Sequence, residues 1–285
     1  MIHYIENDYI KVGVKEFGAE ITSIISKKSN FEFLWQGNPD IWSGQSPILF
    51  PIIGRLLNDS YTLDGKDYIL QKHGFARKLP WALKSKNADS MSFILSENEE
   101  TLKSYPFSFD LIVTYSIDEN KLTVSHDVIN KNKADMYFSL GAHPAFNCEI
   151  GDTLIFDEEE NLDTIKIDLV HSLRLPDTYP VLRNEKVITV TKDVFNEDAL
   201  ILKGVNSKSI SLISQSSARK INFNLGNAPY LGIWAKPGAP YVCIEPWYGV
   251  NDSNEKKADF SEKDDIQKLA PDCSFNFTWS AEFTE

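Results

Sequence analysis

Two acid/base side chains stand in apolar stretches of this sequence. Glu245 lies in YVCIEPWYGVND (241–252), and His143 lies in SLGAHPAFN (139–147), where Pro144 favours an extended backbone at the histidine. Burial without a partner raises the pKa of a carboxyl group towards that of a general base at neutral pH, and histidine holds either protonation state near that pH. Taken singly, each residue also has a plainer interpretation: a carboxylate paired with an arginine, and a hydrogen-bonded histidine at a strand end.

In two further segments, a cationic or imidazole side chain lies where proline or glycine interrupts regular secondary structure. LFPIIGRL breaks regularity with a proline and a glycine just before Arg55, and KHGFARKLPW places His73 before a glycine and Arg77 soon after it. A surface position is the ordinary interpretation of any one of these arginines. Together, the four segments present polar groups at glycine- or proline-marked breaks, where sites on β scaffolds are usually built.

FPIIGRL, KHGFAR, GAHPAFN and IEPWYGVND, in this order and spacing, resemble the aldose 1-epimerase (galactose mutarotase) family. The similarity covers nearly the whole chain, and EPW followed by a glycine and an aspartate looks like the LacX-like and hexose-6-phosphate mutarotase side of the family. The resemblance implies a β-supersandwich and an isomerase that interconverts the α and β anomers of an aldohexose or related sugar. It also implies an acid/base site without a cofactor, and a small-molecule sugar as the binding partner.

The motifs carry roles over to particular residues. His143 matches the family's general acid and Glu245 its general base, so the base would take the C1 hydroxyl proton while the acid protonates the ring oxygen. His73 and Arg55 match the histidine and arginine that bind the sugar.

Three more residues complete the predicted site. Asp198, in FNEDALILK, is the best match to the family's binding aspartate, and Arg77 resembles an arginine that faces phosphate in the sugar-phosphate branch. Trp247 and Trp234 offer flat faces of the kind on which sugars stack, although core packing is the commoner use of tryptophan.

Other functions fit parts of the pattern. His73, His143 and Glu245 are ligand types of a catalytic zinc site, but there is no HExxH and no local pair of histidines, so no metal site is predicted. A sugar-binding or sensing protein would use the same pocket without needing a matched acid and base. A glycosidase usually needs two facing carboxylates, and only one of these motifs presents a carboxylate in a pocket-like context, so this function is disfavoured.

The identity of the sugar stays open. Lys72, Arg77 and Lys78 surround the histidine of KHGFARK and would suit the phosphate of a hexose 6-phosphate. They would equally suit a solvated loop.

Strands must bring these distant segments together. KLTVSHDVIN (121–130) alternates apolar and polar residues with period two, and the same alternation marks SFDLIVTYSI, KVITVTKDVF, SISLISQSS and KINFNLG. Helix is expected only as a short piece in ETLKSYPFSF before Pro106 and as a turn or two in SEKDDIQKLAPD. We therefore expect an all-β chain, a large antiparallel β-sandwich with few short helices, in a single domain over 1–285.

Composition narrows the partners. The net charge of −12, from 41 acidic and 29 basic side chains, disfavours nucleic acid and anionic membranes. No apolar run approaches the ~20 residues that span a bilayer, and no signal-peptide pattern is visible. Three cysteines without paired spacing indicate reduced thiols and a cytoplasmic location. The oligomeric state is not fixed by the sequence.

Three residues near these motifs receive structural interpretations. His126 falls on the apolar face of its predicted strand and is expected in the core. Cys243 lies on the same strand face as Glu245 and is expected to be a small buried hydrophobe rather than a nucleophile. Asp252 either caps a turn or supports the site.

Overall fold

The computed structural model describes residues 1–255 and 257–285 of the chain. Strands hold 52% of the chain and helices 5%, so the prediction of an all-β protein with short helices is confirmed. The predicted alternation is visible directly in the strand Lys121–Asn130, where every second side chain is buried and the others are partly or fully exposed. His126 is one of these buried side chains, as expected of a core histidine.

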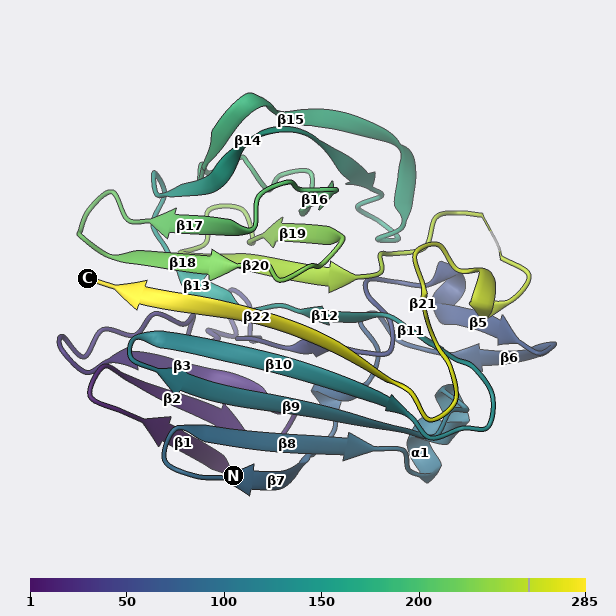
Figure 1. Ribbon diagram of the computed structural model, residues 1–285. Helices are drawn as coiled ribbons and strands as arrows, with labels where there is room; N and C mark the ends of the chain where they lie inside the picture. Colours follow the sequence, from purple (N-terminus) through teal and green to yellow (C-terminus); the bar gives the residue numbers. More distant parts are fainter. Residues whose placement is uncertain (256) are drawn as a thin grey trace.

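A 15-stranded antiparallel sheet dominates the molecule (Figure 1). Its path runs in the order β4 (Ile48–Leu49), β12 (Leu140–Ala142), β20 (Tyr241–Tyr248), β19 (Tyr230–Trp234), β16 (Leu200–Lys203), β14 (Thr153–Ile167), β17 (Ser209–Ile213), β18 (Lys220–Asn224), β22 (Ser274–Thr284), β10 (Lys121–Asn130), β9 (Phe109–Asp118), β8 (Ser90–Ser96) and β7 (Ala82–Lys86). Off this path, β13 (Ala145–Asn147) pairs with β20, and β15 (Arg174–Thr189) pairs with β14.

Smaller sheets and short helices complete the fold. The smaller sheets are β1 (Ile2–Glu6), β2 (Ile10–Lys15) and β3 (Glu20–Ser26); β5 (Ser60–Leu63) and β6 (Lys66–Ile69); and β11 (Met136–Phe138) with β21 (Gln267–Leu269). The helices are α1 (Glu99–Ser104) and the 3₁₀ turns η1 (Leu57–Asp59), η2 (Ala76–Lys78) and η3 (Phe260–Glu262).

The helix α1 begins and ends for local reasons. The Asn98 side chain accepts hydrogen bonds from the backbone N–H groups of Glu100 and Thr101, and the Thr101 hydroxyl accepts one from the Asn98 N–H, which completes a capping box. Pro106 follows two residues after its last residue and cannot continue a helix. The predicted short helix before Pro106 is therefore confirmed.

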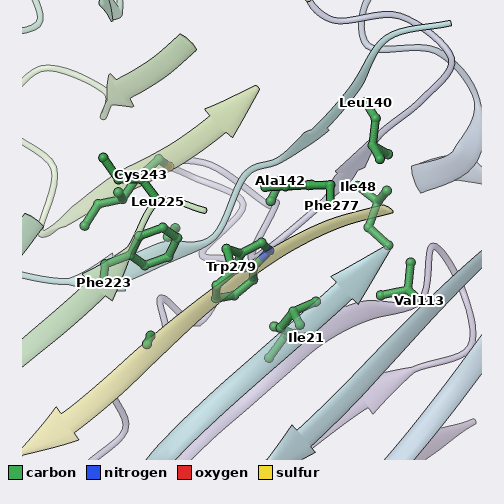
Figure 2. Packing of buried hydrophobic residues seen from close by; sticks show 14 of the residues in the cluster. Ile21, Ile48, Val113, Leu140, Ala142, Phe223, Leu225, Cys243, Phe277 and Trp279 are labelled. Atoms are coloured by element: carbon green, nitrogen blue, oxygen red, sulfur yellow. The ribbon is translucent and has the colours of Figure 1, made fainter. Parts of the chain in front are cut away.

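The core lies between the layers formed by the large sheet and the β1–β3 sheet. Figure 2 shows Trp279 of β22 in its middle, with Phe223 and Ala142 to one side and Ile21 and Val113 to the other. The rings of Trp279 and Phe223 are stacked, with centroids 5.0 Å apart. This dense apolar packing gives the strands of the large sheet a rigid support.

One local prediction needs correction. The segment 186–195 was expected to be one strand, but β15 ends at Thr189 and turns follow, because the apolar side chains beyond it no longer alternate along a pairing strand. The segment 261–272 contains the expected turn, because its first two residues end the 3₁₀ turn η3, and strand β21, which the sequence did not indicate, follows and pairs with β11. In the described parts of the chain, no helix is both long and apolar enough to cross a membrane.

Candidate active site

His143 and Glu245 face each other across neighbouring strands. Gly141 of β12 pairs with Trp247 of β20, and β13 continues in the same register, so the residues between β12 and β13 run on alongside β20 and His143 lies opposite Glu245. The Nε2 atom of His143 lies 3.2 Å from Oε2 of Glu245. Sheet pairing thus brings together two residues that are far apart in the sequence.

Both members of this pair are withdrawn from water. Glu245 is 1% exposed and His143 is 8% exposed. Burial raises the pKa of Glu245 well above its usual value and lowers the pKa of His143 to about 3. Desolvation therefore favours the neutral form of each group, and the pair is poised to exchange a proton.

The two groups keep free hydrogen-bonding capacity. Their 3.2 Å contact is not aligned as a hydrogen bond, and neither Oε2 of Glu245 nor Nδ1 of His143 has another partner among the described residues. Two tryptophans fix the imidazole: Trp42 stacks on it with centroids 5.1 Å apart, and Trp234 meets it edge-on at 5.8 Å. A polar ligand bound in contact with this buried pair would satisfy its unused hydrogen-bonding groups.

A pocket of about 290 Å³ opens over the pair, near the lower limit of small-molecule sites. Most of the predicted site residues lie in its wall. The lining side chains are Trp42, Pro47, Lys72, His73, Arg77, His143, Ile167, Asp198, Ala199, Ile201, Trp234, Glu245, Trp247 and Asn251.

Two glycines beside Glu245 leave room for the Trp247 indole to lie against the floor of the pocket. A Cβ on Gly232, which pairs with Glu245 from β19, would lie 2.7 Å from the Trp247 ring, and so would a Cβ on Gly141. The indole therefore lies flat across both neighbouring strands. Its N–H is buried and makes no aligned hydrogen bond in the described chain, but it lies close enough to the Glu245 carboxylate to lower the pKa of that group, so a ligand would compete with Glu245 for it.

His73 reaches the pocket in a defined tautomer. Its Nδ1 accepts the backbone N–H of Gly54 at 3.1 Å, so the neutral ring carries its proton on Nε2. Burial lowers the pKa of His73 well below its usual value, and the neighbouring charges of Lys72 and Arg77 act in the same direction. His73 is therefore a neutral hydrogen-bond donor.

Two cations lie on the same wall. Arg77 donates from Nη2 to the backbone oxygen of Lys72 at 3.0 Å, and its buried Nε has no partner in residues 1–255 and 257–285. Lys72 donates from Nζ to Oγ of Ser172 at 3.3 Å. Of the two alternatives left open for Lys72, a pocket cation or a solvated loop residue, the structure favours the first, since Lys72 lines the pocket.

Arg55 is placed differently from its prediction. Its guanidinium binds Asp59 through Nε at 2.7 Å and Nη2 at 3.1 Å, and the described lining of the pocket does not include it. The acidic partner four residues away holds the side chain beside η1. Arg77, not Arg55, brings a guanidinium to the pocket.

Sequence reasoning missed several wall residues. Asn251 directly follows EPWYGV and could have been found from that run, because it continues the motif into the pocket. Trp42, in contrast, lies in a loop with no local motif, and its stacking on His143 depends wholly on the fold. Asp198 lies in the wall with a left-handed backbone (φ 73°), and its own Oδ1 accepts the Ala199 N–H.

The fold and pocket define a class of protein: an antiparallel β-sandwich with a buried acid/base pair at the floor of a tryptophan-lined, sugar-sized pocket. The family described as Aldose 1-epimerase matches residues 1–276. The chain belongs to the aldose 1-epimerase family, whose members are isomerases of the mutarotase type.

Individual relatives agree with this membership. The chain is 32% identical over 282 residues to chromosomal Protein LacX of Lactococcus lactis subsp. lactis, covering 94% of each. It is 25% identical over 191 residues to the "Putative glucose-6-phosphate 1-epimerase" of Escherichia coli K12, covering 63% of this chain and 61% of that protein. A crystal structure of a galactose mutarotase related enzyme from Lactobacillus acidophilus superposes with a TM-score of 0.95 at 34% identity, covering 100% of this chain and 98% of that one.

Proposed function

We propose that this protein interconverts the α and β anomers of an aldohexose, with Glu245 as general base and His143 as general acid. The observation that carries the proposal is the 3.2 Å approach of His143 Nε2 to Glu245 Oε2 at the floor of the pocket. The two oxygens that exchange protons in mutarotation are bonded to the same carbon, C1. Acid and base groups for this reaction must therefore stand side by side, as these two do.

The proton inventory of the pair suits the reaction. With His143 as the imidazolium cation and Glu245 ionised, Glu245 takes the proton of the C1 hydroxyl while His143 gives its proton to the ring oxygen, and the C1–ring oxygen bond breaks. The open-chain aldehyde then faces a protonated Glu245 and a neutral His143. Rotation about the C1–C2 bond and the reverse transfers close the ring on the other face.

Burial supports this sequence of charge states. The neutral pair that exists after ring opening is the form that desolvation favours. The ionic pair that starts ring opening is the less stable form in the empty pocket, so it has to form with the sugar bound, and it then gives up its proton readily. His73 Nε2–H, the Trp247 indole and Asp198 would hold the remaining hydroxyls, and Trp42 and Trp234 would bound the ring faces.

The test is the rate at which pure α-glucose, α-galactose and α-glucose 6-phosphate reach anomeric equilibrium, followed by polarimetry or NMR. We expect Glu245→Gln and His143→Asn each to lower kcat by at least ~10²-fold while the protein stays folded. Glu160→Gln is the matched control, because Glu160 is also fully buried but lies outside the pocket, where it accepts the Ser207 N–H. Wild-type rates in either site variant would refute the assignment; binding without turnover would make the protein a sugar sensor.

A specific observation favours a hexose 6-phosphate as substrate. Lys72 and Arg77 lie in the wall of the same pocket, and Arg77 Nε is buried without a partner in the described residues, as an anion-binding group would be before its ligand arrives. The name of the Escherichia coli relative points to the same substrate class.

Lysine and arginine truncations separate the two substrates. Lys72→Met and Arg77→Met should lower kcat/KM for glucose 6-phosphate by ~10- to 100-fold, the loss expected for a charge-assisted hydrogen bond, and change glucose turnover much less. Lys78→Met is the control, because Lys78 is the adjacent exposed cation and does not line the pocket. Equal losses for both sugars would assign the cations to general positioning and leave a neutral hexose as the substrate.

A further inference from the structure

A third side chain adjoins the reacting pair without taking part in the proton transfers. Cys243 lies two residues before Glu245 on β20, so the two side chains share one face of the strand. One donor atom each of His143, Cys243 and Glu245 lies within 4.8 Å of the others, and all three residues are buried. The zinc alternative raised by the sequence named His73 instead, but His73 is not part of this cluster.

We infer that His143, Cys243 and Glu245 form a binding site for Zn²⁺ or a similar borderline-soft divalent cation. Thiolate, imidazole and carboxylate are the three ligand types that zinc takes in proteins, whereas Mg²⁺ and Ca²⁺ prefer oxygen alone. Three protein ligands leave a fourth position. That position faces the pocket, because His143 and Glu245 both line it.

The distances need little adjustment. Zinc bonds of ~2.0–2.3 Å in a tetrahedron put neighbouring donor atoms about 3.5 Å apart. His143 Nε2 and Glu245 Oε2 are already 3.2 Å apart. The sulfur, within 4.8 Å of the other donors, needs to approach by up to about 1.3 Å, which takes a χ1 rotation of roughly 45° at Cys243 or a smaller one shared with shifts of the His143 and Glu245 side chains.

Charge balance decides whether a dication can enter beside Lys72 and Arg77, which line the same pocket. The thiol of Cys243 loses its proton to solvent as the Zn–S bond forms, and Glu245 binds as the carboxylate. Two anionic ligands and one neutral imidazole neutralise Zn²⁺. The metal-bound pocket therefore adds no net positive charge next to the two cations.

The site goes beyond the proposed function, and its consequence for that function is inhibition. A metal on His143 Nε2 and Glu245 Oε2 occupies the atoms that would accept and donate the protons. Metal and sugar should therefore compete for the pocket, and Cys243 makes the protein sensitive to zinc. Metal binding itself can be measured whether or not the protein turns over a sugar.

Cobalt is the probe, because Co²⁺ takes zinc sites and a Co²⁺–thiolate bond gives a near-ultraviolet charge-transfer band. We expect titration of the reduced wild-type protein with Co²⁺ to produce this band together with visible bands of four-coordinate cobalt, and added Zn²⁺ to abolish both. Cys243→Ser should lose the charge-transfer band, with Cys243→Ala as a second variant should serine disturb folding. Cys148→Ser is the matched control, since Cys148 is also a buried free thiol but outside the cluster, and Cys273→Ser controls for the exposed thiol.

The inhibition measurement adds a second readout. Zn²⁺ should slow anomer interconversion by wild type, and Cys243→Ser should raise the half-inhibitory zinc concentration at least ~10-fold while keeping the metal-free rate. A wild-type protein without the charge-transfer band overturns the proposal. So does a band that survives Cys243→Ser or that disappears in Cys273→Ser. Absence of sugar turnover with the band present would instead overturn the proposed function and leave the metal site standing.

Discussion

At the scale of single residues, Gly232 determines how much room a ligand has above Glu245. Its strand conformation is ordinary, so alanine would meet no backbone penalty, but the new Cβ would lie 2.7 Å from the Trp247 ring. The indole would have to tilt into the pocket. We predict that Gly232→Ala lowers kcat/KM for anomer interconversion by ~10²-fold, the effect of misplacing a substrate by about 1 Å.

The matched control is another strand glycine beside an aromatic ring. A Cβ on Gly13 would lie 2.7 Å from the side chain of Tyr4, but that tyrosine is 42% exposed and can move into solvent. Gly13→Ala should keep wild-type kcat/KM. If Gly232→Ala also keeps it, the flat Trp247 indole is not part of the sugar-binding surface.

At the scale of elements, the loop after β20 is held by a buried lysine. Lys263 donates from Nζ to the Val250 carbonyl and to Oδ1 of Asp252, both at 2.7 Å, and its side chain is 3% exposed. Oδ2 of the same aspartate accepts the Leu57 N–H at 3.0 Å. Asp252 therefore supports the site, by joining the loop that carries the pocket residue Asn251 to the segment after FPIIGR.

Removing the amine should loosen this loop. We predict that Lys263→Met lowers the free energy of unfolding by ~3 kcal/mol, because it leaves the mostly buried Asp252 carboxylate without its cationic partner. We also expect the variant to raise KM more than it lowers kcat. Urea unfolding and steady-state kinetics measure the two effects. Lys263→Met combined with Asp252→Asn should lose less stability than the two single changes together.

The control for this pair is an exposed one. Lys268 and Asp135 form an ion pair in which the lysine side chain is 61% exposed, so Lys268→Met should change stability by less than ~1 kcal/mol. Additive losses in the Lys263/Asp252 double variant would show that the two side chains stabilise the loop independently.

The same element scale shows what the sequence can and cannot predict. Strands such as β9 and β10 were predictable because their apolar and polar residues alternate along the sequence, and this local pattern matches the alternating burial of their side chains. The opposition of His143 and Glu245 was not, because it depends on the register between strands distant in sequence. The resemblance in motifs identified the candidate site residues. It also predicted that Arg55 binds the sugar, whereas in the structure Arg55 forms an ion pair with Asp59.

At the scale of the whole molecule, buried histidines should make the fold sensitive to acid. His73, His126 and His143 all have pKa values below the usual value, with burial as the main cause. The unfolded chain binds protons at these side chains from about pH 6.5 downward, while the folded protein excludes them until lower pH. The free energy of unfolding is therefore complete above pH 6.5 and falls as the pH is lowered.

His126 isolates this effect from the active site. Burial lowers its pKa from 6.5 to about 4, which corresponds to a loss of about 3 kcal/mol between those two pH values. It stacks on Phe277 with centroids 5.2 Å apart, so phenylalanine should fill its place. We predict that His126→Phe shifts the acid-unfolding midpoint, measured by circular dichroism, to lower pH, whereas His171→Gln, which removes only an exposed ion pair with Asp168, shifts it far less. An unchanged midpoint in His126→Phe would show that His126 takes up its proton in the folded protein as readily as in the unfolded chain.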